Sequence, residues 1–357
     1  MLFFTSSYIT GQVSFSGKES STNKQFISQK KSSDEERVPF RVMSWNVENL
    51  FDTHHDTLKN DNEFLPDAIR HWNYTKYKKK LADMARVITA VGEWNPPALV
   101  GLCEVENDTV LRDLTRRSPL KELGYRYVMT SSPDLRGIDV ALLYQRDLFK
   151  LLSSRSISIP PFNQHRPTRD LLHVNGLLLT GDTLDVFVCH LPSRSGGAKE
   201  SEPYRLHAVQ ILRTEADSIL YKRLHPQVII MGDFNDYPTN KSIQEVLEAE
   251  APSPTLSPLK LYHLLARKAK SKDFGSYKYR GEWGLLDHLI VSGALLNQSG
   301  KFFTSEEKAN VCLLPFLLIE DKKYGGREPF RTYKGMKYQG GISDHLPIYT
   351  DFELILY

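Results

Sequence analysis

The chain has 357 residues, of which 46 are Lys or Arg and 43 are Asp or Glu, so that its formal net charge is +3. Hydrophobic residues make up 40% and charged residues 25% of the sequence. These proportions exclude a disordered chain, a collagen-like repeat and a disulfide-dense miniprotein. Because dedicated nucleic-acid-binding domains are more basic and cluster their charge, composition alone leaves the function open.

The first 37 residues are expected to lie outside the folded part of the chain. Residues 13–37 are polar, rich in Ser and Lys and without periodicity, which indicates a disordered leader or linker. Residues 1–12 look like the second half of an export signal without its basic beginning. We expect a periplasmic or extracellular protein if this is a truncated signal, and a cytoplasmic one otherwise. Residues 38–357 are expected to form a single domain that contains no transmembrane segment.

From residue 38 onward, apolar strand-like runs alternate with helical stretches. Strands are expected over residues 40–47, 98–105, 125–131, 138–145, 171–179, 184–191, 227–234, 285–292, 302–314 and 346–354. Helices are expected over residues 74–94, 110–118, 203–224 and 240–250. The three cysteines lie in apolar runs and are expected to be buried thiols. Buried strands that alternate with helices predict a mixed α/β layered domain.

Polar residues follow or begin six of the predicted strands. The segments are SWNVEN (44–49), CEVEN (103–107), CHLPSR (189–194), GDFND (232–236), Asp287-His288 and SDHLP (343–347). Each segment alone is commonly a turn, a cap or a surface pair, but all six occupy equivalent places in the strand pattern. Because ligands collect at strand ends in layered α/β folds, these side chains are expected to meet.

The residue types in these segments indicate one kind of chemistry. Carboxylate and amide oxygens with few cysteines suit a hard cation such as Mg²⁺ or Mn²⁺. Histidines beside aspartates suit proton transfer and phosphate contact. Arg194 and Arg205 could neutralise a phosphate. The combination predicts metal-assisted hydrolysis of a phosphate ester.

The same motifs resemble the endonuclease/exonuclease/phosphatase superfamily, which includes deoxyribonucleases, abasic-site endonucleases, inositol polyphosphate 5-phosphatases and neutral sphingomyelinases. The matching motifs, in the order of the family, are SWNVEN (44–49), LCEVEN (102–107), RGIDVALLY (136–144), HLPSR (190–194), GDFN (232–235), LLDHLIVS (285–292) and SDHLP (343–347). The resemblance covers about residues 40–352. It implies a four-layer α/β sandwich in which two packed mixed β-sheets are flanked by helices.

The resemblance also implies the residues that hold the metal and act on the attacking water. Glu104 is expected to be the principal metal ligand, assisted by Asn46, with Asp344 near the metal. Mg²⁺ is the expected ion, and Mn²⁺ or Ca²⁺ are alternatives. Asp233 and Asn235 resemble the pair that positions or deprotonates the water.

The remaining expected roles concern the leaving group and the phosphate. His345 resembles the second essential imidazole of the family, and Asp287 the carboxylate that orients it. His190 resembles the imidazole that hydrogen-bonds the scissile phosphate or protonates the leaving group. Some relatives have Asn there, so His190 places the chain nearer the deoxyribonuclease and sphingomyelinase branches. Arg136, Arg194 and Arg205 are expected to contact the substrate, and the protein is expected to be a monomer.

Three readings of the substrate stay open. The first is a nuclease or general phosphodiesterase, and the second is a phosphomonoesterase or a phosphodiesterase acting on phospholipids or inositol phosphates. The third is a non-catalytic binder that kept the fold, which the competent residue at every expected catalytic position disfavours. The sequence shows no helix-turn-helix or zinc finger, so cleavage of nucleic acid would have little sequence preference.

Four loops or runs bear on this choice. Residues 52–73 contain His54-His55, and residues 193–205 form a Gly-rich loop. Residues 321–341 mix basic and aromatic residues, a pattern that suits nucleic acid and equally an ordinary solvated loop. A role with lipid head groups would require an exposed apolar hairpin, for which residues 313–319 are a candidate, although we expect a buried strand there.

Overall fold

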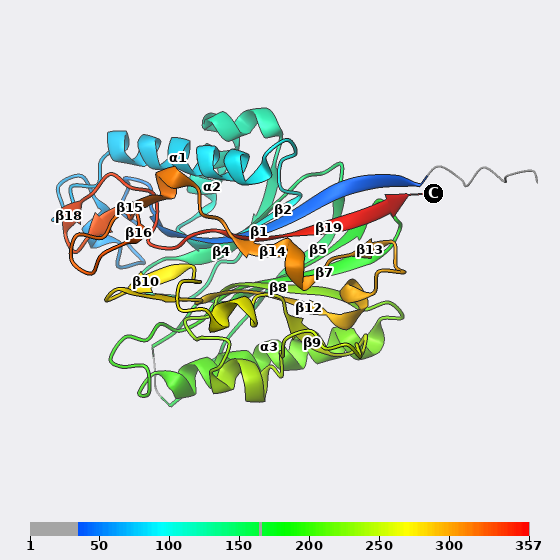
Figure 1. Ribbon diagram of the computed structural model, residues 1–357. Helices are drawn as coiled ribbons and strands as arrows, with labels where there is room; N and C mark the ends of the chain where they lie inside the picture. The colour runs from blue at the N-terminus through cyan, green and yellow to red at the C-terminus, as the bar shows by residue number, and fades with distance from the viewer. Residues whose placement is uncertain (1–34, 164–165, 357) are drawn as a thin grey trace, which may run out of the picture. The chain divides into compact units, whose positions relative to one another are not determined.

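Two mixed β-sheets lie face to face in the computed structural model, which describes residues 35–163 and 166–356 (Figure 1). The seven-stranded sheet has the order β13 (Phe302–Phe303), β19 (Ile348–Leu356), β1 (Glu36–Leu50), β2 (Leu99–Val105), β4 (Asp139–Tyr144) and β3 (Arg126–Met129), and β14 (Ala309–Val311) also pairs with β19. The six-stranded sheet has the order β5 (Phe149–Ile157), β6 (Leu171–Leu178), β7 (Thr183–His190), β8 (Gln227–Asp233), β12 (Asp287–Ser292) and β9 (Leu261–His263).

Helices cover the outer face of each sheet. Helices α1 (Tyr74–Gly92) and α2 (Asp108–Arg117) cover the seven-stranded sheet, and α3 (Glu202–Lys222) covers the six-stranded sheet (Figure 1). Helix α1 begins where the Asn73 side chain accepts a hydrogen bond from the Lys76 amide, and it buries Leu81, Met84 and Ile88. The expected four-layer α/β sandwich is confirmed.

The strand directions bring the polar segments to one edge of the sandwich. Strands β1 and β2 are parallel, with Asn46 opposite Cys103, and β7 and β8 are parallel, with His190 opposite Asp233. Strand β12 runs antiparallel to β8 and begins at Asp287, which faces Asp233. The carboxyl ends of the four parallel strands therefore lie at the same edge as the start of β12.

Several sequence expectations are wrong in detail. The helix expected over residues 240–250 is only a π-helical turn, Ser242–Val246, and Glu248 has a φ of 54°, which no continuing helix allows. The strand expected over residues 302–314 is divided into β13 and β14 by a 3-10 turn. Strand β5 was not expected; five consecutive residues in its middle and second half are exposed, so its sequence lacks the continuous apolar pattern.

Residues 313–319 do not form the expected buried strand. They form a 3-10 turn, Pro315–Leu317, followed by β15 (Leu318–Glu320), which pairs only with β16 (Arg327–Pro329). Leu313 is 63% exposed and Ile319 is 42% exposed. The segment therefore contributes one strand of a surface hairpin, in which Leu317 is buried while Leu313 and Ile319 are exposed.

The described residues from Glu36 onward form one compact unit, whose first strand begins at Glu36. All three cysteines are buried and free, as expected. Within residues 35–163 and 166–356, no helix combines the length and apolarity that spanning a bilayer requires. The leader expected over residues 1–37 lies, up to residue 34, outside the described residues.

Candidate active site

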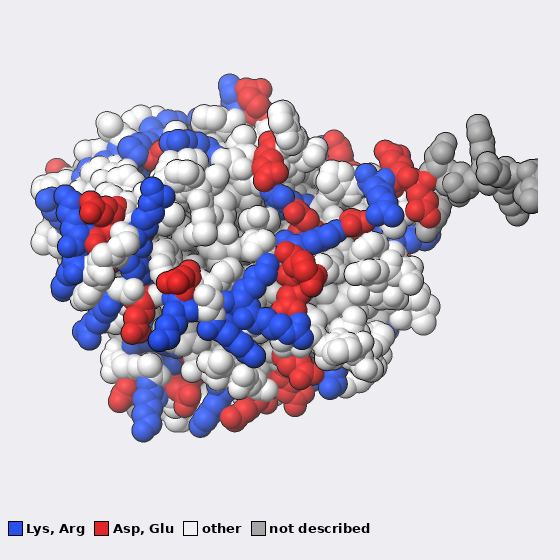
Figure 2. Space-filling model, viewed as in Figure 1, with Lys and Arg blue, Asp and Glu red and all other residues white. Residues whose placement is uncertain are grey.

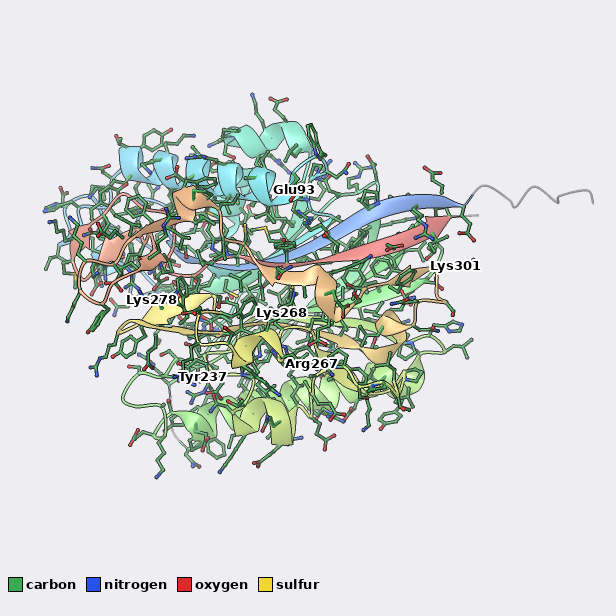
Figure 3. The ribbon with its side chains drawn as sticks, viewed as in Figure 1. Glu93, Tyr237, Arg267, Lys268, Lys278 and Lys301 are labelled. Carbon is green, nitrogen blue, oxygen red and sulfur yellow. The ribbon has the colours of Figure 1, made fainter. Side chains whose placement is uncertain are left out.

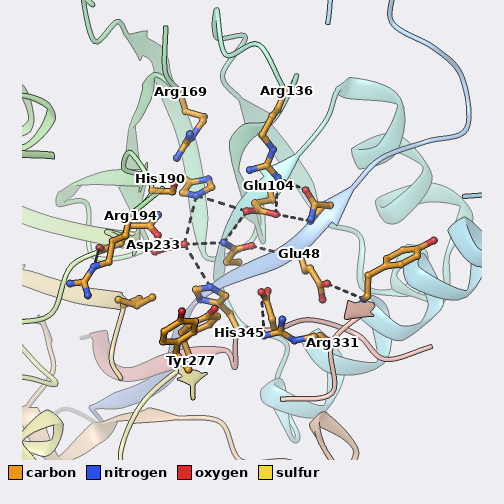
Figure 4. A pocket seen from close by; sticks show the side chains of 18 of the residues that line it. Glu48, Glu104, Arg136, Arg169, His190, Arg194, Asp233, Tyr277, Arg331 and His345 are labelled. Carbon is orange, nitrogen blue, oxygen red and sulfur yellow. Dashed lines mark hydrogen bonds and ion pairs between the residues drawn. The ribbon is translucent and has the colours of Figure 1, made fainter. Parts of the chain in front are cut away.

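A pocket of about 760 Å³ opens at the edge where the parallel strands end (Figure 4). Nine of the residues singled out in the sequence line it: Asn46, Glu104, Arg136, His190, Arg194, Asp233, Asn235, Asp344 and His345. Asp287 lies directly behind His345, and Arg205 lies elsewhere. The structure thus brings together segments that are separated by up to about 300 residues in the chain.

Asp233 is a buried carboxylate with fixed hydrogen-bond partners in the pocket. Its Oδ2 accepts a hydrogen bond from Asn46 Nδ2 (3.0 Å), and its Oδ1 accepts one from the Asn235 amide (2.8 Å). The side chain is 2% exposed. Burial is the main cause that raises the pKa of Asp233 to about 7; the charge of His345 opposes this rise and that of Asp287 adds to it. A carboxylate with this pKa can exchange a proton near neutral pH.

Gly232 lets Asp233 reach this position. Its φ is +136°, and a Cβ built there would lie 1.9 Å from the carbonyl oxygen of Cys189 on the neighbouring strand β7. Only glycine permits both the backbone angle and the close approach of the two strands.

His345 and Asp287 form a buried pair. His345 Nδ1 lies 2.7 Å from Asp287 Oδ2, which also accepts a hydrogen bond from Ser276 Oγ (2.5 Å). His345 Nε2 faces Asp233 Oδ2 at 3.9 Å. Burial alone would lower the pKa of His345, but the charges of Asp287 and Asp233 hold it well above its ordinary value. The imidazole is therefore a cation that Asp287 orients toward Asp233.

His190 has the opposite electrostatic environment. Its Nε2 lies 3.7 Å from Asp233 Oδ2 and 4.0 Å from Glu104 Oε1. Burial, together with the charges of Arg169 and Arg136, lowers the pKa of His190 well below its ordinary value. Its Nδ1 is buried and has no hydrogen-bond partner among the described residues. His190 is thus a neutral imidazole at the centre of the pocket.

Glu104 supplies the carboxylate best suited to a metal. Its Oε2 accepts a hydrogen bond from the Asn49 amide (2.8 Å), while Oε1 makes long contacts with Asn46 Nδ2 (3.5 Å) and His190 Nε2 (4.0 Å). Asn46 turns its amino group toward both carboxylates, and its Oδ1 accepts a hydrogen bond from the Glu48 amide.

The described residues contain no group of three or more His, Cys, Asp or Glu side chains arranged to hold an ion. Mg²⁺, however, usually retains several waters and binds one or two carboxylates together with substrate phosphate. The single underused oxygen of Glu104 fits such a site. Asp344 also lines the pocket, where its Oδ2 lies 3.8 Å from Arg331 Nη2.

The three arginines singled out in the sequence have different surroundings. Arg136 lies 3.6 Å from Glu104 Oε2. Arg194 lines the pocket, stacks on Tyr237 and donates a hydrogen bond to the Asn235 carbonyl (2.8 Å). Arg205 is 1% exposed and does not reach the pocket, because its Nε pairs with Asp236 Oδ1 at 2.8 Å. The structure therefore does not support Arg205 as a substrate contact.

The pocket also contains residues that the sequence did not single out. These are Glu48, Arg70, Arg169, Tyr277 and Tyr333, among others. Glu48 lies within the SWNVEN run and could have been selected with Asn46. Arg169 precedes β6 in an unremarkable segment, and no sequence signal distinguishes it.

The loops contribute unequally to the pocket. Arg70 comes from residues 52–73, whereas His55 of the same loop hydrogen-bonds Asp61 and lies outside the lining. Lysines and arginines gather over the edge that carries β15, β16 and β18 (Figure 2). Lys278 of β10 (Tyr277–Tyr279), labelled in Figure 3, is buried, and its charge is paired with Asp321, whose Oδ2 lies 2.9 Å from Nζ.

Comparison with known proteins identifies the family of this chain. A model of the endonuclease/exonuclease/phosphatase family matches residues 41–354, and the chain belongs to that family. Its members hydrolyse phosphate esters and generally use divalent metals, so the expectation of an enzyme of this class is confirmed. Comparison with curated proteins finds no match.

Solved structures share the fold at low sequence identity. The mannosyl-6-phosphatase of Bacteroides thetaiotaomicron is 15% identical, with a TM-score of 0.56 over 89% of this chain and 100% of that chain. A humanized D. rerio TDP2 is 16% identical, with a TM-score of 0.54 over 88% and 98%. The human Nocturnin catalytic domain with bound sulfate is 19% identical, with a TM-score of 0.50 over 89% and 97%.

Proposed function

We propose that this chain is a Mg²⁺-dependent phosphodiesterase, an endonuclease-like hydrolase with little sequence specificity. The observation that carries the proposal is the convergence of Asp233, His190, His345 and Glu104 in one pocket. A carboxylate poised near neutral pH, a cationic imidazole, a neutral imidazole and an underused carboxylate have complementary roles in hydrolysis at phosphorus.

Asp233 takes the proton of the attacking water in this proposal. Its two oxygens are fixed by Asn46 and by the Asn235 amide, so the water is held in one direction. The cationic His345, fixed by Asp287, stabilises negative charge that develops on the phosphoryl oxygens. Asn46 orients Asp233 and Glu104 rather than offering its own oxygen to the metal.

His190 donates a hydrogen bond to the phosphate rather than a proton to the leaving group. Because its pKa is lowered well below the ordinary value, the imidazole is uncharged at neutral pH and keeps a single N–H, which can donate a hydrogen bond but is not released as a proton. Arg136 and Arg169 lie on its side of the pocket and supply further positive charge for the phosphate (Figure 4). A divalent ion held by Glu104, with Asp344 nearby, would act as a Lewis acid on a phosphoryl oxygen; Mn²⁺ and Ca²⁺ are alternatives to Mg²⁺.

A second candidate function, that of a phosphomonoesterase, is favoured by the arginines that line the pocket. Five arginines, Arg70, Arg136, Arg169, Arg194 and Arg331, line a volume in the range of small-molecule sites. A terminal phosphate dianion would use this charge more fully than a diester monoanion would.

One panel of substrates separates the two candidates. Plasmid DNA, RNA, bis-p-nitrophenyl phosphate, p-nitrophenyl phosphate, mannose 6-phosphate and sphingomyelin are incubated with the protein and Mg²⁺. Nicked plasmid or diester turnover supports the proposal, whereas turnover of monoesters alone replaces it with the second candidate. Asp233→Asn and His190→Ala should each slow hydrolysis by about 10²–10⁴-fold. Wild-type rates in either variant would contradict the assigned roles.

A further inference from the structure

One wall of the pocket is a hairpin that is anchored from helix α1. Strands β17 (Tyr333–Lys334) and β18 (Lys337–Tyr338) form the hairpin of residues 332–342, and Tyr333 and Gly335 line the pocket. Its end leads directly into Ser343, Asp344 and His345. The position of this hairpin therefore influences the position of the SDH segment (residues 343–345) relative to the pocket.

Lys80 of α1 lies beneath the base of this hairpin. It is 2% exposed, and its Nζ donates to the Glu48 carbonyl (3.0 Å), to Thr332 Oγ1 (2.7 Å) and to the Ile342 carbonyl. An ammonium group has three N–H donors, and here each one has an acceptor. Thr332 and Ile342 are the two ends of the hairpin, so one buried cation holds both ends to β1.

Glu48 fixes the same point from the other side. Its carboxylate accepts hydrogen bonds from the Thr332 amide (2.6 Å) and the Tyr333 amide (3.1 Å). Thr332 Oγ1 also donates to the Ile342 carbonyl (3.0 Å). Burying a lysine is costly unless all of its hydrogen bonds are made. The complete network around Lys80 meets that condition.

The network continues into the catalytic segment. Ser343 Oγ donates to the Asn46 carbonyl (2.7 Å) and accepts from the His345 amide (3.1 Å). Trp45 Nε1 donates to the His345 carbonyl (3.0 Å). The His345 backbone is therefore tied to β1 just beyond the point where Lys80 ties the hairpin to the same strand.

Two neighbouring lysines contact the same hairpin, and one does not. Lys79 Nζ donates to the Gly340 carbonyl (2.8 Å), and Lys76 Nζ lies 4.6 Å from the centre of the Tyr338 ring. Lys78 instead contacts the Arg117 carbonyl (3.4 Å) at the end of α2. The lysine-rich start of α1 thus serves mainly as a contact surface for the hairpin, and Lys78 offers a matched control on the same helix.

We propose that Lys80 is a positioning residue for catalysis, which clamps both ends of the 332–342 hairpin and thereby sets the placement of Asp344 and His345. The effect of the clamp on catalysis rests on the proposed function. The clamp itself, which is a set of hydrogen bonds, does not depend on it. Replacing Lys80 by Met keeps the length and apolar body of the side chain and removes all three donors.

The test compares Lys80→Met with Lys78→Met, using the best substrate of the panel. Because displacing a catalytic group by about 1 Å can cost about 10²-fold, Lys80→Met should lower kcat/KM by roughly that factor, and Lys78→Met should leave it unchanged. Thr332→Val removes one acceptor of the clamp while keeping the shape. In the Thr332→Val background, Lys80→Met should cost clearly less than it does alone, because the two changes break one network.

Hydrogen exchange of the peptide 330–345 gives a readout that needs no substrate. Lys80→Met and Thr332→Val should each speed exchange there, whereas Lys78→Met should not. Unchanged exchange in both clamp variants would overturn the clamp, whatever the activity. Faster exchange with wild-type kcat/KM, or fully additive losses in the double variant, would overturn its catalytic role. If the wild type hydrolyses none of the substrates, the proposed function fails, but hydrogen exchange still tests whether the clamp exists. If Lys80→Met does not fold, exchange in Thr332→Val alone tests the clamp.

Discussion

At the residue scale, Asp287 determines the charge and the orientation of His345. Because the Asp287 charge holds the pKa of His345 above its ordinary value, Asp287→Asn should lower that pKa and slow hydrolysis by about 10²–10⁴-fold. NMR titration of labelled histidines follows the pKa, and kcat/KM gives the rate.

The pair His173–Asp185 is a natural control for this change. Its atoms Nε2 and Oδ1 lie 2.9 Å apart on β6 and β7, and neither residue lines the pocket. Asp185→Asn should leave the rate unchanged. If Asp287→Asn keeps both the rate and the titration of His345, the pair does not act as proposed.

Asp233 should also make the metal-free protein less stable at neutral pH than an uncharged side chain would. The pKa of Asp233 is 3.8 in the unfolded chain and about 7 in the folded protein. Between pH 3.8 and pH 7 the folded state therefore binds more protons than the unfolded state. The free energy of unfolding therefore falls as the pH rises through this window. Asp233→Asn removes the effect and should raise the melting temperature at pH 8 by several degrees.

Thermal unfolding in EDTA at several pH values measures this difference. The gain of Asp233→Asn over the wild type should be much smaller at pH 4 than at pH 8 and should disappear below the unfolded pKa of 3.8, where the wild-type carboxyl is protonated in both states. A gain that is the same at pH 4 and pH 8 would show that packing, rather than the buried charge, causes it.

At the scale of elements, the approach of β7 and β8 depends on Gly232. Gly232→Ala should lower the free energy of unfolding by roughly 3 kcal/mol or more, because the methyl group meets the Cys189 carbonyl and the backbone angle is unfavourable. Gly181 has a φ of +84° and open space around the site of a Cβ. Gly181→Ala should therefore cost only about 1–2 kcal/mol.

Urea unfolding compares the two glycine variants, and hydrolysis reports on Asp233. Gly232→Ala should also lose activity, since it moves the residue that follows it. Equal destabilisation by the two changes would mean that the contact with Cys189 contributes nothing beyond the backbone angle.

The sequence predicted those elements whose signal is local. Buried strands such as β2 and β8 read as continuous apolar runs, and the polar residues near the ends of β1, β2 and β8 pointed to Asn46, Glu104 and Asp233. The hairpin at β17 and β18 has no such pattern, because it is held by Lys80 and Glu48 from distant segments. Arg205 was misread because an arginine at the start of a helix, here α3, looks the same in the sequence whether it faces a pocket or a buried aspartate.

At the scale of the whole molecule, the near-zero net charge conceals an uneven distribution. Both sheets direct charged side chains to one edge, where five arginines and the carboxylates of Glu48, Glu104, Asp233 and Asp344 line the same pocket. Opposite charges brought together in this way create a strong local field although the total is only +3. Such a site can attract a cation and an anion to neighbouring positions.

A divalent ion that binds this edge should stabilise the whole domain. Ligand that binds only the folded state adds RT ln(1 + [L]/Kd), about 2.7 kcal/mol at a hundredfold excess over Kd. Thermal unfolding should therefore shift upward with Mg²⁺ concentration and return with EDTA. Glu104→Gln should remove most of the shift, because the amide offers the ion no negative charge.

Glu106→Gln is the matched control for the Mg²⁺ experiment. Glu106 belongs to the same LCEVEN run, but its carboxylate accepts a hydrogen bond from the Asp52 amide (2.6 Å) and does not line the pocket. This variant should retain the Mg²⁺-dependent shift even if its own melting temperature changes. A shift that survives in Glu104→Gln, or vanishes equally in both variants, would locate the ion elsewhere. The ion would then have to approach the phosphate from another part of the pocket, where Asp344 is the next carboxylate to replace.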